Sequence, residues 1–278
     1  MATKVAEVPL HEIPGRVAEI FNALLMKERS RDVSSYFCPD VETCSLEVGH
    51  GAYNVDKCGV TQVGCAVITN GHIEAGSPYS IDINWLGHPS AASEAELEEM
   101  IQKTKNEIEF KNGMPTGKQY TVSVNRMRIG RPPKDVMTEV YRFLESRLNR
   151  GYKIVGYNML RFDIPAVFNN FIRAGVEVSD TQRNALFDQC YENSWDIGLM
   201  IKAAAGRQGP WPNENKLEFY QRVNKMFLTN KWAQDTVGIP AFNVNIDHGI
   251  HAKEAHDAAI DCLIPHFIFQ KLRTICRV

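Results

Sequence analysis

Val60-Thr-Gln-Val-Gly-Cys-Ala-Val-Ile-Thr69 has the composition of a β-strand, and Asn70-Gly71 directly after it is a strong signal for a tight hairpin turn. A second apolar run, Ile73 to Trp85, follows this turn, and a shorter run, Ser35-Tyr-Phe-Cys-Pro-Asp40, precedes the pair. Together the three runs predict a meander of three antiparallel strands.

Helical and strand patterns alternate after the meander. Lys153 to Tyr157 reads as a short buried strand, and polar loops are expected at 111–133 and 206–215. Helices are predicted at 15–29, 93–110, 134–149, 164–174, 195–205, 216–227 and 254–275. Antiparallel strands followed by alternating helix and strand predict one main domain of α/β class, with helices on the faces of a mixed sheet.

The composition excludes several classes of protein. The chain has 278 residues, of which 44% are hydrophobic and 23% charged, as in ordinary globular proteins. A net charge of -2 disfavours a protein that coats nucleic acid by bulk positive charge. No run approaches the roughly 18 apolar residues of a membrane span, and the charged N-terminus does not resemble a secretory signal. Seven cysteines without a Cys-x-x-Cys pair favour a reducing cytoplasm.

Acidic residues stand at the ends of the predicted elements. Asp40 and Glu42 come where the first strand is expected to end, and residues two apart on a strand share a face. Asp163 follows the strand at Lys153, and Asp261 lies in the last helix, five residues after His256. Five residues of helix turn through about 500°, so His256 and Asp261 point in different directions. This spacing suits a base at His256 better than a second ligand.

Four carboxylates in one place would repel each other and raise their own pKa values, and a divalent cation removes that cost. Oxygen-only ligands favour Mg²⁺ or Mn²⁺. Two such ions can bind the attacking and leaving oxygens of a phosphodiester, while a neutral histidine accepts a proton from the attacking water. The residues therefore predict metal-assisted hydrolysis of a phosphate ester.

Four stretches resemble motifs of the DnaQ-like 3′–5′ exonucleases of the DEDDh type, especially the nuclease domains of exonuclease I-type enzymes. They are Asp40-Val-Glu42-Thr43, Gly156-Tyr-Asn-Met-Leu-Arg-Phe-Asp163, Asn193-Ser-Trp-Asp196 with the Trp211-Pro-x-Asn loop, and Ala255-His-Asp-Ala-Ala-Ile-Asp261. The resemblance covers about 35–272. It implies a ribonuclease H-like five-stranded sheet, three antiparallel strands and then parallel ones, within a domain at 35–278. Residues 1–34 would be a helical extension, and 87–132 an insertion.

The resemblance also implies roles for single residues. Asp40, Glu42, Asp163 and Asp261 would hold two Mg²⁺ ions, for which Mn²⁺ can substitute, and His256 would be the general base. Thr43 and Cys44 would border the 3′-terminal nucleotide, and Asn158 would support the second motif. The implied reaction is 3′–5′ hydrolysis of DNA, preferably single-stranded, to 5′-mononucleotides. An exoribonuclease of the same fold and an inactive nucleic-acid-binding module remain alternatives.

Some positions keep two readings. Pro39 is unusual in a central strand because it lacks an N–H donor, so it should lie at a bulge or at the strand end. The acid-x-acid motif could instead be placed at Ser45-Leu-Glu47, but that stretch lacks the first acid. We therefore prefer the placement that begins at Asp40. Asp196 is expected to cap a helix rather than join the site. Four basic residues could bind phosphates or line a solvated loop: Arg126, Arg128, Arg131 and Lys134.

Overall fold

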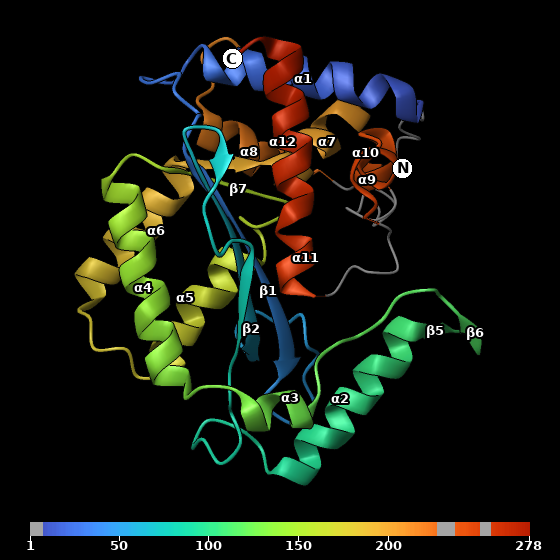
Figure 1. Ribbon diagram of the computed structural model, residues 1–278, viewed down its shortest axis with the longest axis vertical. Helices are drawn as coiled ribbons and strands as arrows, with labels where there is room; N and C mark the ends of the chain where they lie inside the picture. The colour runs from blue at the N-terminus through green and yellow to red at the C-terminus, as the bar shows by residue number, and fades with distance from the viewer. Residues whose placement is uncertain (1–7, 227–236, 251–256) are drawn as a thin grey trace.

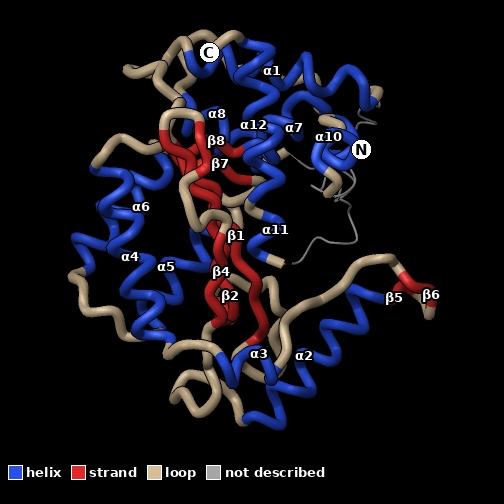
Figure 2. Tube along the Cα trace, in the orientation of Figure 1, coloured by secondary structure: helices blue, strands red, loops and turns tan. Residues whose placement is uncertain are grey.

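A computed structural model describes residues 8–226, 237–250 and 257–278 (Figure 1). A mixed sheet runs through the middle of the molecule, with helices on both faces (Figure 2). The predicted α/β class is therefore confirmed. Within the described ranges, no helix is both long and apolar enough to cross a lipid bilayer.

The sheet has the strand order β3-β2-β1-β7-β8, and β4 also pairs with β2. β1 and β2 are antiparallel, whereas β7 is parallel to both β1 and β8. β3 and β4 occupy successive parts of the same edge of β2, so the single strand expected at 73–85 is broken in two. The strands are β1 (Tyr36–Ser45), β2 (Cys58–Thr69), β3 (His72–Ile73), β4 (Tyr79–Asp82), β7 (Lys153–Gly156) and β8 (Ser194–Asp196).

β1 is longer than its apolar run indicates. It continues through Pro39 to Ser45, so Asp40 and Glu42 lie within the strand, and the prediction that they end it is wrong. Pro39 is tolerated there because N–H groups alternate between the two edges of a strand. The N–H of Val41 points away from β2, so the nitrogen of Pro39 also faces away from β2, beyond the short stretch where β7 pairs with β1.

The helices form two layers around the sheet. α4, α5 and α6 cover one face, while α11 and α12 lie on the other, where α1 and α7 pack against α12 (Figure 1). The helices of the two layers are α1 (Ile13–Leu25), α4 (Pro133–Asn149), α5 (Asp163–Arg173), α6 (Asp180–Glu192), α7 (Ile197–Ala205), α11 (Ala258–Asp261) and α12 (Leu263–Cys276).

The segment expected as an insertion carries its own elements. α2 (Glu94–Glu109) starts at the predicted capping box of Ser93 and Glu96 and leads to a small hairpin of β5 (Phe110–Lys111) and β6 (Met114–Pro115). α3 (Val124–Ile129) then lies beside β4. The expectation of a loop throughout 111–133 is therefore wrong. The sequence does not reveal these elements because they are too short to show apolar periodicity of their own.

Three further differences concern the C-terminal half. Residues 194–196 form β8, so the helix predicted from Trp195 starts later, at Ile197. α6 was not predicted, since only Leu186 and Cys190 of it are buried. The helix predicted at 254–275 is divided, and α11 ends at Asp261 before α12 begins. The remaining elements are a 3-10 helix (Leu10–Glu12), α8 (Lys216–Asn224), α9 (Ile239–Ala241) and α10 (Val244–His248).

Candidate metal centre

Three carboxylates meet where α11 crosses the sheet. Asp40 and Glu42 leave β1 on the face covered by α11, and Asp261 is the last residue of that helix. One oxygen from each of the three lies within 4.8 Å of the others. Glu42 and Asp261 are buried, and Asp40 is partly exposed.

Residues of β2 fix the start of α11. Gly64 lies against the backbone of Ala258, where a side chain at position 64 would overlap the carbonyl group. The backbone N–H of Ala258 donates to Oε1 of Gln62 over 3.0 Å. The backbone N–H of Asp261 donates to the carbonyl oxygen of Asp257 over 2.9 Å, which closes one helical turn. These contacts place the Asp261 carboxylate over β1.

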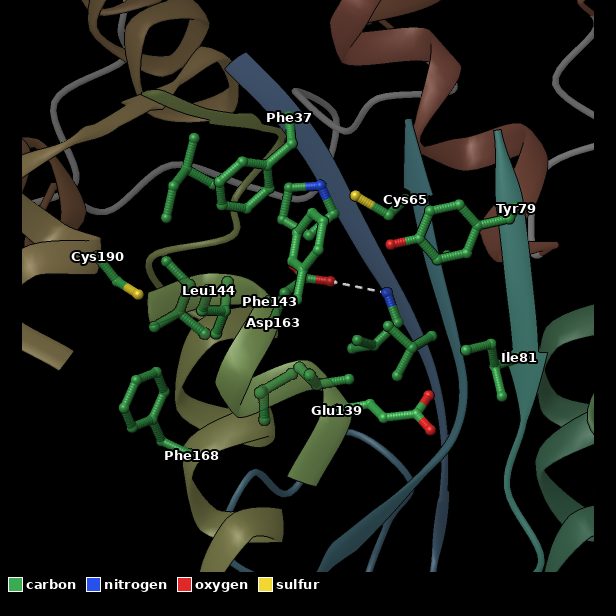
Figure 3. Close-up of a pocket in the computed structure, with 18 residues that line it drawn as sticks. Phe37, Cys65, Tyr79, Ile81, Glu139, Phe143, Leu144, Asp163, Phe168 and Cys190 are labelled. Carbon is green, nitrogen blue, oxygen red and sulfur yellow. Dashed lines mark hydrogen bonds between the residues drawn. The ribbon is translucent and has the colours of Figure 1, made fainter. Parts of the chain in front are cut away.

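Asp163 reaches the same strand from its edge. It is the first residue of α5, and its Oδ1 accepts a hydrogen bond of 3.2 Å from the N–H of Val41 (Figure 3). Val41 lies between Asp40 and Glu42, so the fourth acid is bonded to the backbone that carries two of the others. Asp163 also borders an apolar cavity of about 310 Å³ between the sheet and α4 and α5, lined among others by Phe37, Phe143 and Phe168.

Burial and mutual repulsion raise the pKa values of these acids. The pKa of Asp40 lies well above its ordinary value because the group is desolvated and because Asp261 and Asp163 are close. The same two causes raise the pKa of Glu42, which Arg126 lowers in part. Desolvation raises the pKa of Asp163 to about 7, although the hydrogen bond from Val41 opposes the shift. A cation bound here would relieve these costs.

Asp196 is a buried carboxylate with a structural task. It caps α7 by accepting from the N–H of Leu199 at 3.0 Å, which confirms the capping interpretation. It also accepts from the N–H groups of Asn158 at 2.9 Å and Leu160 at 3.1 Å. These bonds shape the turn that precedes Asp163, in which Asn158 has a positive φ of 60°. Burial raises the pKa of Asp196 to about 6, and the three bonds oppose that shift.

The other predicted site residues have the following positions. Thr43 is buried beside the acids, and its hydroxyl donates to the carbonyl oxygen of Ala52 at 2.8 Å. Cys44 is buried in β1, and Asn158 lies in the turn held by Asp196. His256 lies outside the described residues. The roles of these four residues stay predictions.

The basic residues of the expected phosphate-binding loop are engaged with carboxylates. Arg126 contacts Asp82 at 3.1 Å and Asp257 at 3.4 Å. The other three pair with single glutamates: Arg128 with Glu94, Arg131 with Glu139, and Lys134 with Glu177. The side chains of Arg128, Arg131 and Lys134 are 46–52% exposed, which agrees with the interpretation as solvated residues, and the phosphate-binding role stays a prediction. These pairings could not be predicted from local spacing, since the partners lie between 8 and 131 positions apart in the chain.

The donor set is suited to a hard divalent cation. All the candidate ligands are carboxylate oxygens, which suit Mg²⁺, Mn²⁺ or Ca²⁺ and not the sulfur- and nitrogen-preferring metals. Because the acids are desolvated and repel one another, the fold holds them together at an energetic cost that a cation would offset. The residues therefore fit a divalent metal centre.

Comparison with known proteins supports the fold. No family model and no curated protein matches this chain. Among solved structures, it is similar to Escherichia coli exonuclease I in a zinc-bound complex with single-stranded DNA, with a TM-score of 0.52 and 16% identity over 87% of this chain and 41% of the other. A complex of the same enzyme with a dA16 oligonucleotide gives a TM-score of 0.52 and 16% identity over 88% and 41%.

A third complex of exonuclease I, with a dT13 oligonucleotide, gives a TM-score of 0.52 and 14% identity over 88% of this chain and 42% of the other. The chain thus spans about two fifths of the length of exonuclease I and shares the fold of that part. The predicted ribonuclease H-like sheet is confirmed, but it has six strands rather than five because the expected third strand is broken in two.

Proposed function

We propose that this protein is a metal-dependent 3′–5′ exonuclease that hydrolyses the phosphodiester bonds of DNA, preferably single-stranded, and releases 5′-mononucleotides. The observation that carries the proposal is the group formed by Asp40, Glu42 and Asp261 within 4.8 Å, with Asp163 bonded to the same strand. The similarity of the fold to exonuclease I, whose structures contain DNA oligonucleotides, supports the choice of substrate.

In this proposal the four acids hold two Mg²⁺ ions, for which Mn²⁺ can substitute. Bound cations would neutralise the charge of the phosphate and promote ionisation of the attacking water. His256 takes the proton from that water, Thr43 and Cys44 border the 3′-terminal nucleotide, and Asn158 supports the second motif on the substrate side. The partly exposed side of Asp40 is the approach for the substrate. We further expect the protein to act in the cytoplasm.

The central test is digestion of a 5′-labelled single-stranded DNA oligonucleotide with Mg²⁺ and, separately, with EDTA. We expect a ladder of shortened labelled products with Mg²⁺ only, because 3′–5′ attack leaves the label on the shrinking strand. An RNA of the same sequence distinguishes an exoribonuclease from a deoxyribonuclease. Binding of DNA without any shortening would identify an inactive binding module and contradict the proposal.

Asp163→Asn tests the site within this assay. The amide oxygen can still accept the N–H of Val41, so the fold is kept while a charged ligand is lost. We expect activity to fall more than about a hundredfold, beyond the usual effect of losing an outer-shell partner of a metal. The matched control is Asp188→Asn on the exposed side of α6, which should cut normally. Normal cutting by Asp163→Asn would show that the site is misplaced.

A further inference from the structure

Arg126 joins the segment between β4 and α4 to the helix that carries Asp261. It lies in α3, and its guanidinium bridges two carboxylates: Nε lies 3.1 Å from Oδ1 of Asp82, and Nη1 lies 3.4 Å from Oδ2 of Asp257. The three side chains are only 25–31% exposed, so the bridge is partly shielded from water. Partial burial makes such a pair stronger than one on an open surface.

Asp257 connects Arg126 to Asp261. Asp257 is the N-cap of α11, and its Oδ1 accepts from the N–H of Ala259 at 3.0 Å while its Oδ2 faces Arg126. The carbonyl oxygen of Asp257 accepts from the N–H of Asp261 at 2.9 Å. A movement of Asp257 would therefore move the whole single turn of α11, and with it the Asp261 carboxylate.

A second connection converges on the same anchor. Nε2 of Gln62 donates to Oδ1 of Asp82 at 3.2 Å, and Oε1 of Gln62 accepts from the N–H of Ala258 at 3.0 Å. Asp82 thus holds the start of α11 through Arg126 on one side and through Gln62 on the other. α11 has only four residues and continues through Cys262, whose N–H bonds to the carbonyl oxygen of Ala258, into α12. Its C-terminal end is thus held by α12, and the contacts from Asp82 hold its N-terminal end, where Asp257 lies.

We propose that Arg126 is a positioning residue that holds Asp261 in the metal centre, so that the segment containing α3 forms part of that centre. This inference rests on the proposed function, since it assumes that the acids bind a cation. Arg126 does not act as a ligand, because a guanidinium cannot give up its proton to bind a cation. Its contacts with Asp82 and Asp257 instead hold α11 to β4.

The alternative role for Arg126 is purely electrostatic, since its positive charge lowers the pKa of Glu42. The two roles predict opposite signs. Loss of a repelling positive charge would tighten binding of a cation, whereas loss of Asp261 from its position would weaken it. The sign of the change in affinity therefore decides between them.

The experiment measures Mn²⁺ affinity by titration calorimetry, without substrate, on the full chain. For Arg126→Gln we expect the Kd to rise about tenfold or more, the usual effect of losing an outer-shell partner. For Arg126→Lys, which keeps the charge but cannot bridge both acids, we expect a smaller rise in the same direction. The matched control is Arg128→Gln on the same helix, whose partners are Glu94 and Asn125 and not Asp82 or Asp257, and its Kd should equal that of the wild type.

A double-mutant cycle tests the route through Asp82. If the bridge acts as a unit, Arg126→Gln combined with Asp82→Asn should weaken Mn²⁺ binding no more than the larger single change. Fully additive effects would overturn the inference. Thermal unfolding in EDTA shows whether each variant folds. If Arg126→Gln does not fold, Arg126→Lys takes its place in the Mn²⁺ titration.

The outcomes separate this inference from the proposed function. If the wild type binds Mn²⁺ and Arg126→Gln binds it equally well or more tightly, only the positioning role is overturned. If the wild type binds no Mn²⁺ at all, the metal centre itself is wrong, and both proposals are overturned.

Discussion

His266 shows what burial does to a single titratable residue in this protein. It is 1% exposed in α12, and its Nδ1 lies 3.1 Å from the hydroxyl oxygen of Tyr36 in β1. Burial, with a smaller effect of His248, lowers the pKa of His266 from 6.5 to about 4. The ring is therefore neutral in the folded protein near pH 7, and it connects α12 to the strand that carries the acids.

This lowered pKa predicts a pH-dependent loss of stability. Between pH 6.5 and 4 the unfolded chain binds a proton at His266 that the folded protein does not, so stability falls as the pH falls. The resulting decrease in the free energy of unfolding reaches about 3 kcal/mol below pH 4, at about 1.4 kcal/mol for each pKa unit. His266→Gln, which keeps a polar partner for Tyr36, should lose this part of the slope in urea unfolding. An unchanged slope would contradict the assignment.

The acids of the site were predictable as residues because their chemistry is local. A strand places Asp40 and Glu42 on one face whatever its length, and the start of a helix after a strand places Asp163 at the sheet. The bonding of Asp163 to Val41 and the bridge from Arg126 to Asp257 could not be predicted. These contacts join residues more than a hundred positions apart, and no spacing in the sequence reports them.

At the scale of elements, the position of α11 depends on a glycine in β2. Gly64 provides the surface against which Ala258 lies, and any Cβ at that position would overlap the Ala258 backbone. The strand pairs with β1 on one edge and β4 on the other, so it cannot move aside easily. The position of the metal-centre helix is thus set by the sheet beneath it.

Gly64→Ala should therefore destabilise the protein by about 1–3 kcal/mol, the range for forcing an added carbon into a packed interior. It should also weaken Mn²⁺ binding, because α11 would be lifted from the sheet. Gly209→Ala is the control: no atom lies within 4 Å of its added carbon, so the free energy of unfolding should change by less than about 0.5 kcal/mol. Chemical denaturation measures both variants, and equal stability of the two would refute the packing argument.

Elements with strong patterns were predictable and those without were not. The capping box at Ser93 and the apolar stripe of α5 define helices that the structure confirms. β8 was hidden because its three residues continue directly into α7, so a helical pattern seemed to start at Trp195. α6 has only two buried residues, too few for an apolar stripe, although its Ser179–Gln182 capping box was a usable signal.

At the scale of the whole molecule, the fold brings negative charge together from distant parts of the chain, and Arg126 offsets it only in part. The net charge is only -2, yet the acids of the metal centre come from β1, α5 and α11, elements far apart in the sequence. Their raised pKa values mean that the metal-free protein loses stability as the pH rises and the carboxyl groups ionise. For Asp163 this loss runs from about pH 4 to about pH 7.

A divalent cation should reverse that trend. Binding requires ionised carboxylates, so the stabilisation by Mn²⁺ should be larger at pH 7.5 than at pH 5.5. At a hundredfold excess over the Kd it amounts to about 2.7 kcal/mol, or a rise in Tm of about 5 °C or more for a chain of this size. Scanning calorimetry with Mn²⁺ and with EDTA at both pH values measures it. A shift of equal size at both pH values would count against ligation by these acids.

The hydrogen bond from Val41 to Asp163 gives the protein a built-in reporter. The Val41 amide lies between Asp40 and Glu42 in the chain, and its proton is donated to Oδ1 of Asp163. Any event that alters the charge on that oxygen must change the electronic surroundings of this proton, even if no atom moves far. In an ¹⁵N-labelled sample, the Val41 resonance should therefore shift when a diamagnetic ion such as Mg²⁺ arrives, and one peak would follow occupancy of the centre from within the sheet.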